Sequence, residues 1–78
     1  MDELNRLSER IIGCAIEVHR HLGPGLKEQV YEAALAFELN LAGMRFSRQM
    51  SFPVLYKGRQ IGRYRLDLLV EDAVVVEV

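Results

Sequence analysis

Two acidic residues flank a short polar turn near the end of the sequence. Asp67 lies five residues before Asp72, and Glu77 lies five residues after it. A three-residue loop centred on Asp72 would place the two carboxylates opposite each other on neighbouring strands, with β-carbons about 5 Å apart. Like charges in this position destabilise a sheet unless a cation compensates them. Because Mg²⁺ takes carboxylate oxygens together with water and phosphate oxygens, the spacing predicts a metal site.

Two alternatives remain open for this pair of carboxylates. A two-residue turn would shift the register by one residue and send the two side chains to opposite faces of the sheet. In the second alternative, Arg63 or Arg65 neutralises the pair as a surface salt bridge.

A second group of residues that could do chemistry runs from Gly25 to Tyr31. If Gly25 is the N-cap of a helix, Glu28 falls at the third helical position, where its carboxylate can reach a free backbone amide. In the functional alternative, Glu28 points towards the sheet face that bears Asp67 and adds a third carboxylate. Tyr31 follows one helical turn later on the same side and could offer its hydroxyl to that cluster or to a phosphate.

Several other kinds of site are excluded by composition. Cys14 is the only cysteine, so the chain can form neither an internal disulfide nor a cysteine-based zinc site. His19 and His21 are too close in sequence to share one helical face. No catalytic triad and no phosphate-binding glycine loop is present.

The whole sequence, 1–78, is expected to form a single small domain. The net charge of −1 does not by itself indicate a nucleic-acid partner, but five of the eight arginines lie between residues 45 and 65. That bias is compatible with phosphate contact and equally with solvated strand edges. No signal peptide and no apolar run of about 20 residues is visible, so a cytoplasmic location is expected.

Helical periodicity dominates residues 4–42. The first apolar stripe ends at Gly23-Pro24-Gly25, a helix-breaking run, and Asp2 or Asn5 could cap its start. A second helix is predicted over residues 26–42, with Gly43 as its end. Its main apolar stripe consists of Leu26, Val30, Ala33, Ala34, Phe37 and Leu41. Leu35 and Leu39 add apolar surface on another side, which indicates a helix packed between two layers.

From Arg45 the apolar period changes to two, which predicts strands. The first strand contains Pro53 and is therefore expected at a sheet edge or at a bulge. Residues 57–60 predict a hairpin turn, and further strands are predicted over 61–70 and 74–78. The expected fold class is α+β, with two N-terminal helices packed on a three-stranded antiparallel β-meander.

The sequence resembles the bacterial GxxExxY protein family, whose name describes Gly25, Glu28 and Tyr31 here. The resemblance also covers residues 11–19, the run Tyr64-Arg65-Leu66-Asp67-Leu68-Leu69-Val70, and Val76-Glu77-Val78. That family is placed in the PD-(D/E)XK nuclease superfamily, which implies a partial nuclease-like core and a nuclease-type function.

The resemblance also implies roles for individual residues. Asp67 and Glu77 would bind Mg²⁺ (or Mn²⁺), with the backbone carbonyl of Val78 as a further ligand. Glu28 would be the helix-borne acid, and Tyr31 would join it in the catalytic group. The lysine of the superfamily pattern would come immediately after Val78, so we expect a C-terminally truncated domain that is inactive as this chain.

The function predicted from these features is Mg²⁺-dependent hydrolysis of nucleic-acid phosphodiesters, in DNA or in RNA. Arg48, Arg63 and Arg65 are expected to contact phosphates without base specificity. The alternative is a non-catalytic interaction module that keeps the fold and pairs an exposed strand edge with another chain. A homodimer with a continuous sheet is the expected outcome of such pairing.

Overall fold

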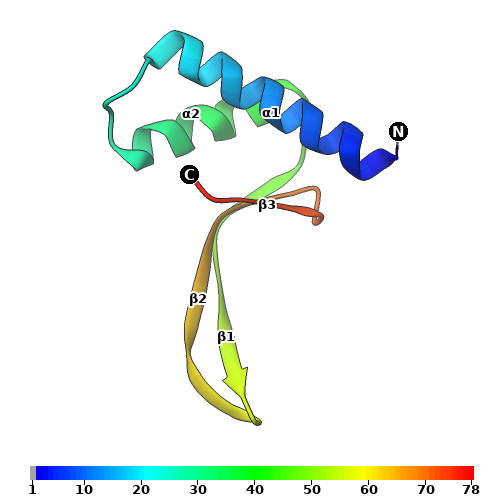
Figure 1. The fold of residues 1–78 in the computed structure, drawn as a ribbon, viewed down its shortest axis with the longest axis vertical. Coiled ribbons are helices and arrows are strands. Elements are labelled where there is room, and N and C mark those ends of the chain that lie inside the picture. The colour runs from blue at the N-terminus through cyan, green and yellow to red at the C-terminus, as the bar shows by residue number, and fades with distance from the viewer. Residues whose placement is uncertain (1) are drawn as a thin grey trace.

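The computed structural model describes residues 2–78 and shows two helices followed by a three-stranded sheet (Figure 1). The elements are α1 Glu3–Leu22, α2 Glu28–Leu41, β1 Phe46–Tyr56, β2 Arg59–Val70 and β3 Val74–Val76. The predicted α+β fold class is therefore confirmed. The boundaries differ slightly from those expected, since α2 begins at Glu28 and β3 ends at Val76.

Helix α1 begins and ends at residues suited to those positions. Asp2 is the N-cap, and its Oδ1 accepts a hydrogen bond of 2.8 Å from the amide of Asn5. Gly23 ends the helix at a φ of 68°, a left-handed conformation that glycine adopts readily, and its amide donates to the carbonyl of His19. Within residues 2–78, neither helix combines the length and the apolar character that crossing a membrane requires.

The loop between the helices is held by Tyr31. Its hydroxyl donates to the carbonyl of Gly23 at 2.6 Å and accepts from the amide of Leu26 at 3.1 Å. The N-cap of α2 is Lys27 and makes no side-chain capping bond, so the prediction of Gly25 as the cap is wrong. Glu28 is the first residue of the helix, where its negative charge still favours the positive end of the helix dipole.

The sheet has the strand order β1-β2-β3 and is antiparallel throughout. In Figure 1 the long β1–β2 hairpin extends away from the helices, and β3 runs beside the base of β2. Pro53 lies in edge strand β1, and the register shifts just beyond it, between Val54 and Leu55, as the sequence predicts. Val70 pairs with Val74. Of the two registers left open, the three-residue loop 71–73 is therefore the one observed.

The hydrophobic core lies between the two helices and the base of the sheet. Its fully buried side chains are Leu39, Leu68 and Val70, with Ile11 and Val18 contributed by α1. The predicted main stripe of α2 is wrong, because Phe37 and Leu41 are 63% and 67% exposed whereas Leu35 and Leu39 are buried. Both stripes fit the helical period. The helical period therefore cannot tell which stripe is buried, and the packing partner of α2 decides it.

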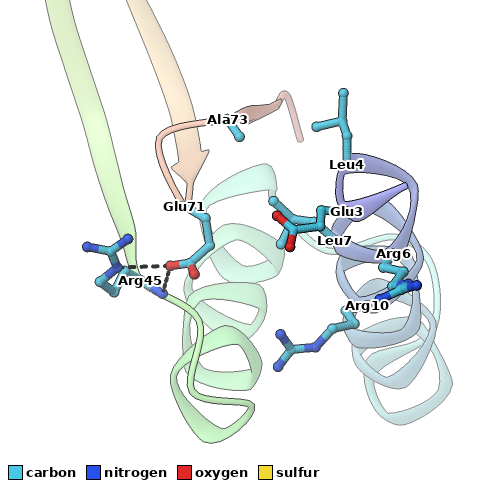
Figure 2. Close-up of a pocket in the computed structure, with 8 residues that line it drawn as sticks. All are labelled: Glu3, Leu4, Arg6, Leu7, Arg10, Arg45, Glu71 and Ala73. Carbon is cyan, nitrogen blue, oxygen red and sulfur yellow. Dashed lines mark hydrogen bonds and ion pairs between the residues drawn. The ribbon is translucent and has the colours of Figure 1, made fainter. Parts of the chain in front are cut away.

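Glu71 ties the β2–β3 loop to the start of β1 (Figure 2). Its Oε2 accepts from the backbone amide of Arg45 at 2.7 Å and from Arg45 Nε at 3.1 Å. In return, the amide of Glu71 donates to the carbonyl of Arg45 at 2.8 Å. Glu71 and Asp72 both have left-handed φ values, near 52° and 53°. These contacts hold the loop in the form that sets the β2–β3 register.

The contacts of Glu71 predict a pH dependence of stability. The hydrogen bond from the Arg45 amide holds the pKa of the Glu71 carboxyl below its usual value of 4.5, against an opposing effect of partial burial, and the Arg45 side chain lowers it further. Because the folded-state pKa is the lower one, the stabilisation is complete above the ordinary pKa and is lost as the pH falls through the folded value. Thermal unfolding of the wild type and Glu71→Gln should differ at neutral pH and converge in acid.

The control for this experiment is Glu9→Gln, an exposed glutamate on α1. We expect it to unfold with the wild type at every pH. A constant difference between the wild type and Glu71→Gln from neutral pH into acid would show that ionisation of Glu71 does not stabilise the fold.

Candidate functional site

A polar groove of about 560 Å³ lies between the start of α2 and the sheet. We call it the α2–sheet groove, and its lining residues are Glu28, Gln29, Glu32, Arg48, Gln49, Arg65 and Asp67. Three carboxylates and two guanidinium groups therefore share one hollow. Carboxylate oxygens suit hard divalent cations, and guanidinium groups suit phosphate.

Asp67 is held in the groove by its own strand. The next residue, Leu68, is fully buried in the core and fixes the backbone of β2 at this point. Asp67 Oδ2 accepts a hydrogen bond of 2.8 Å from the amide of Val78. Within residues 2–78, its Oδ1 has no hydrogen-bond partner. One carboxylate oxygen is thus anchored and the other is left for an additional ligand.

Glu77 does not line the α2–sheet groove. It follows β3, and its Oε1 accepts from the hydroxyl of Tyr64 at 3.4 Å. It lines a separate cavity of about 230 Å³, together with Tyr31 and His19. Since the strand ends at Val76, regular alternation is not imposed on Glu77. The structure brings Glu28 and Asp67 to one hollow and places Glu77 and Tyr31 at another. The catalytic and metal-binding roles of these residues stay predictions.

The donor set of the α2–sheet groove fits Mg²⁺ only as a two-carboxylate site. Among the described residues, no group of three or more acidic, histidine or cysteine side chains is arranged to hold a metal ion. Mg²⁺ commonly takes one or two carboxylates and completes its shell with water and substrate phosphate. Glu28 and Asp67 supply that number of hard oxygen donors in the same groove.

Glu32 is a site residue that the sequence analysis missed. It is only 6% exposed, yet both carboxylate oxygens are satisfied. Oε2 accepts a hydrogen bond from Arg48 Nε at 3.1 Å and forms an ion pair with Arg48 Nη2 at 3.0 Å, and Oε1 accepts a hydrogen bond from Gln49 Nε2 at 2.6 Å. A signal was present: Glu32 lies three residues before Leu35 and seven before Leu39, on the face that is buried. A glutamate on a buried helical face requires a polar partner.

The three arginines predicted to contact phosphate occupy different surroundings. Arg48 and Arg65 line the α2–sheet groove. Arg63 instead donates to the hydroxyl of Ser51 at 3.1 Å and to its backbone carbonyl at 3.5 Å. In the part of the chain that the structure describes, no ion pair joins an arginine to Asp67 or Glu77, so the alternative of a neutralising surface salt bridge is not observed.

Comparison with known proteins covers residues 5–78. A family model described as the PD-(D/E)XK nuclease superfamily matches residues 5–78. That range includes both helices from Asn5 onwards, all three strands and every residue of the groove. No curated protein matches the chain, and no solved structure matches it.

Proposed function

Because the chain belongs to the PD-(D/E)XK nuclease superfamily, we propose that it is a metal-dependent nuclease domain acting on nucleic-acid phosphodiesters. The observation that carries the proposal is the α2–sheet groove, which combines Glu28 and Asp67 with the guanidinium groups of Arg48 and Arg65. A nuclease needs carboxylates for its cation and positive charge for the phosphate backbone. This groove supplies both.

Glu28 and Asp67 would hold Mg²⁺ (or Mn²⁺) in the groove. Glu77 and the Val78 carbonyl line the separate cavity and are proposed as ligands from the family resemblance alone. When bound, such an ion lowers the pKa of a coordinated water and neutralises phosphate charge. Val78 donates its amide to Asp67 and thereby orients that carboxylate. Glu28 brings its carboxylate to the groove from the first turn of α2. Arg65 adds a guanidinium group for phosphate in the same hollow.

The finer family assignment is also a proposal. Gly25, Glu28 and Tyr31 support membership of the GxxExxY family. In the structure this spacing has a local basis, since Tyr31 bonds to both sides of the turn that contains Gly25. Phosphate contacts through arginine do not read bases, so the proposed substrate is a phosphodiester backbone without sequence preference.

Calorimetric titration with MnCl₂ tests the metal site. We expect the wild-type chain to bind Mn²⁺ and Asp67→Asn to bind it at least about tenfold more weakly, because a neutral amide is a poorer ligand than a carboxylate. The matched control is Asp72→Asn, the same substitution at an exposed residue of the neighbouring loop. Equal binding by the wild type and Asp67→Asn, or no binding by the wild type, would remove the support for a nuclease site.

A second candidate function is a non-catalytic interaction module that forms a homodimer. It is favoured by the open outer edges of β1 and β3, which have no neighbouring strand in the described chain. Strand edges with unpaired amides and carbonyls can pair with a second copy. Size-exclusion chromatography over a range of concentrations should then show a dimer, and a monomer at every concentration would count against this function.

A further inference from the structure

The most constrained polar cluster in the protein is centred on Glu32. Among the described residues, Glu32 is the one buried charged residue, and it receives two hydrogen bonds and an ion-pair contact from two consecutive residues of β1. Burying a carboxylate costs free energy unless it is paired and hydrogen-bonded. Here the pairing is complete, and it takes place on the wall of the α2–sheet groove.

The backbone of β1 is distorted at this point. Consecutive residues of a strand normally point to opposite faces of the sheet, yet Arg48 and Gln49 both reach Glu32. Gln49 achieves this with a left-handed φ of 54°, and the register passes from Arg48↔Leu68 to Met50↔Leu66 without a pair for Gln49. Strained residues of this kind are typical of functional sites, where they redirect a side chain.

The contacts leave free hydrogen-bond donors on both β1 side chains. A guanidinium group has five N–H donors, and those on Nη1 of Arg48 are not used by Glu32. The carboxamide of Gln49 must turn its nitrogen towards Glu32, because a carboxylate can only accept. That nitrogen retains a second N–H. Both residues line the same groove as Asp67.

We propose that Glu32 is a positioning residue that holds Arg48 and Gln49 as a preformed clamp for a phosphate of the nucleic-acid backbone. The proposal rests on the proposed function of the groove. Glu32 does not take the phosphate or a cation itself, since both of its oxygens already accept hydrogen bonds. The fork of the Arg48 guanidinium, paired through Nε and Nη2, is fixed in one orientation, and lysine cannot reproduce that geometry.

Binding of a fluorescein-labelled DNA duplex of about 20 base pairs, followed by anisotropy at several salt concentrations, tests the clamp. EDTA in the buffer removes divalent cations and keeps the result independent of the metal site. We expect Glu32→Gln to weaken binding by about fivefold and to lower the salt slope by about one, as loss of one phosphate contact does. We expect Arg48→Lys to behave in the same way, because it keeps the charge but not the fork.

Matched controls are Glu38→Gln, on the same helix, and Arg59→Lys, at the start of β2, neither of which lines the groove. Both should bind like the wild type. Circular dichroism verifies that each variant folds. If Glu32→Gln does not fold, the binding of Arg48→Lys alone tests the clamp.

Each remaining outcome has a distinct meaning. If Glu32→Gln binds the duplex as tightly as the wild type or more tightly, Glu32 merely repels phosphate and the clamp is refuted. A wild-type salt slope in Arg48→Lys refutes it too, because Arg48 would then act as a point charge. In either case the proposed function survives. A wild-type chain without affinity for the duplex overturns the clamp, whereas the Mn²⁺ titration tests the proposed function separately.

Discussion

Replacing Leu68 with alanine is expected to lower the free energy of unfolding by about 2–5 kcal/mol. Leu68 is fully buried in the core beneath both helices, and its strand carries Asp67. Truncation removes apolar contacts and leaves a cavity that the surrounding side chains fill only partly. Small domains have a total stability of only about 5–15 kcal/mol. The variant should therefore show a large fall in the urea midpoint of unfolding, measured by circular dichroism.

The control for Leu68→Ala is Leu55→Ala, in the distal part of the β1–β2 hairpin. Leu55 is 64% exposed, so the same change should alter stability by no more than about 0.5 kcal/mol. Comparable losses in the two variants would mean that Leu68 is not part of a packed core. The position of Asp67 above that core would then also be in doubt.

The sequence predicts the order and type of all five elements, because each carries a strong local signal. The Gly23-Pro24-Gly25 run separates the helices, and the change of period after Arg45 marks the sheet. The position of Pro53 correctly indicates an edge strand. For the last turn the sequence leaves two registers open, and the one centred on Asp72 is observed. All of these signals lie within a few residues of the feature that they determine.

The buried face of α2 could not be predicted in the same way. The helix is apolar on two sides, so the sequence defines two stripes of similar quality. Leu35 and Leu39 are buried because they join the same core as Leu68 and Val70 of the sheet. The contact between α2 and β2 joins residues about thirty positions apart in sequence. No local pattern contains that information.

The residues of the candidate site likewise divide into those that the sequence predicts and those that it does not. Asp67 and Glu28 were found from sequence, and the structure brings both to one groove. The sequence pattern does not single out Glu32, because the apolar stripe that it favours on α2 is not the buried one. The sequence does not predict the role of Gln49 either, because glutamine has no general preference for a left-handed φ. Here that φ occurs together with the hydrogen bond from Gln49 to Glu32.

Replacing Glu32 with alanine should lower the free energy of unfolding by about 2–3 kcal/mol. The substitution leaves Arg48 and the amide of Gln49 without their acceptor, and the left-handed conformation of Gln49 loses the bond that supports it. Loss of one partner of a fully buried pair costs more, about 3–5 kcal/mol. The Arg48 side chain is 44% exposed and can turn to water, which reduces the cost here. Urea unfolding measures the difference.

The matched control is Glu38→Ala, on the same helix and outside the groove, which should unfold within about 0.5 kcal/mol of the wild type. If Glu32→Ala unfolds as the control does, the hydrogen bonds and the ion pair of Glu32 contribute no net stability. The clamp would then lack the rigidity that it requires.

Removing both charges separates stability from binding. In the double variant Glu32→Leu with Arg48→Leu, no charge remains unpaired, and replacement of a buried ion pair by apolar residues is often neutral or stabilising. We expect the double variant to unfold closer to the wild type than Glu32→Ala does, while its affinity for the DNA duplex falls at least as far as that of Arg48→Lys. A double variant that is both stable and fully able to bind would show that the pair serves neither purpose. If the double variant is stable but binds the duplex weakly, the role of the buried Glu32 carboxylate is to orient Arg48 towards phosphate. An apolar pair of similar volume cannot do this.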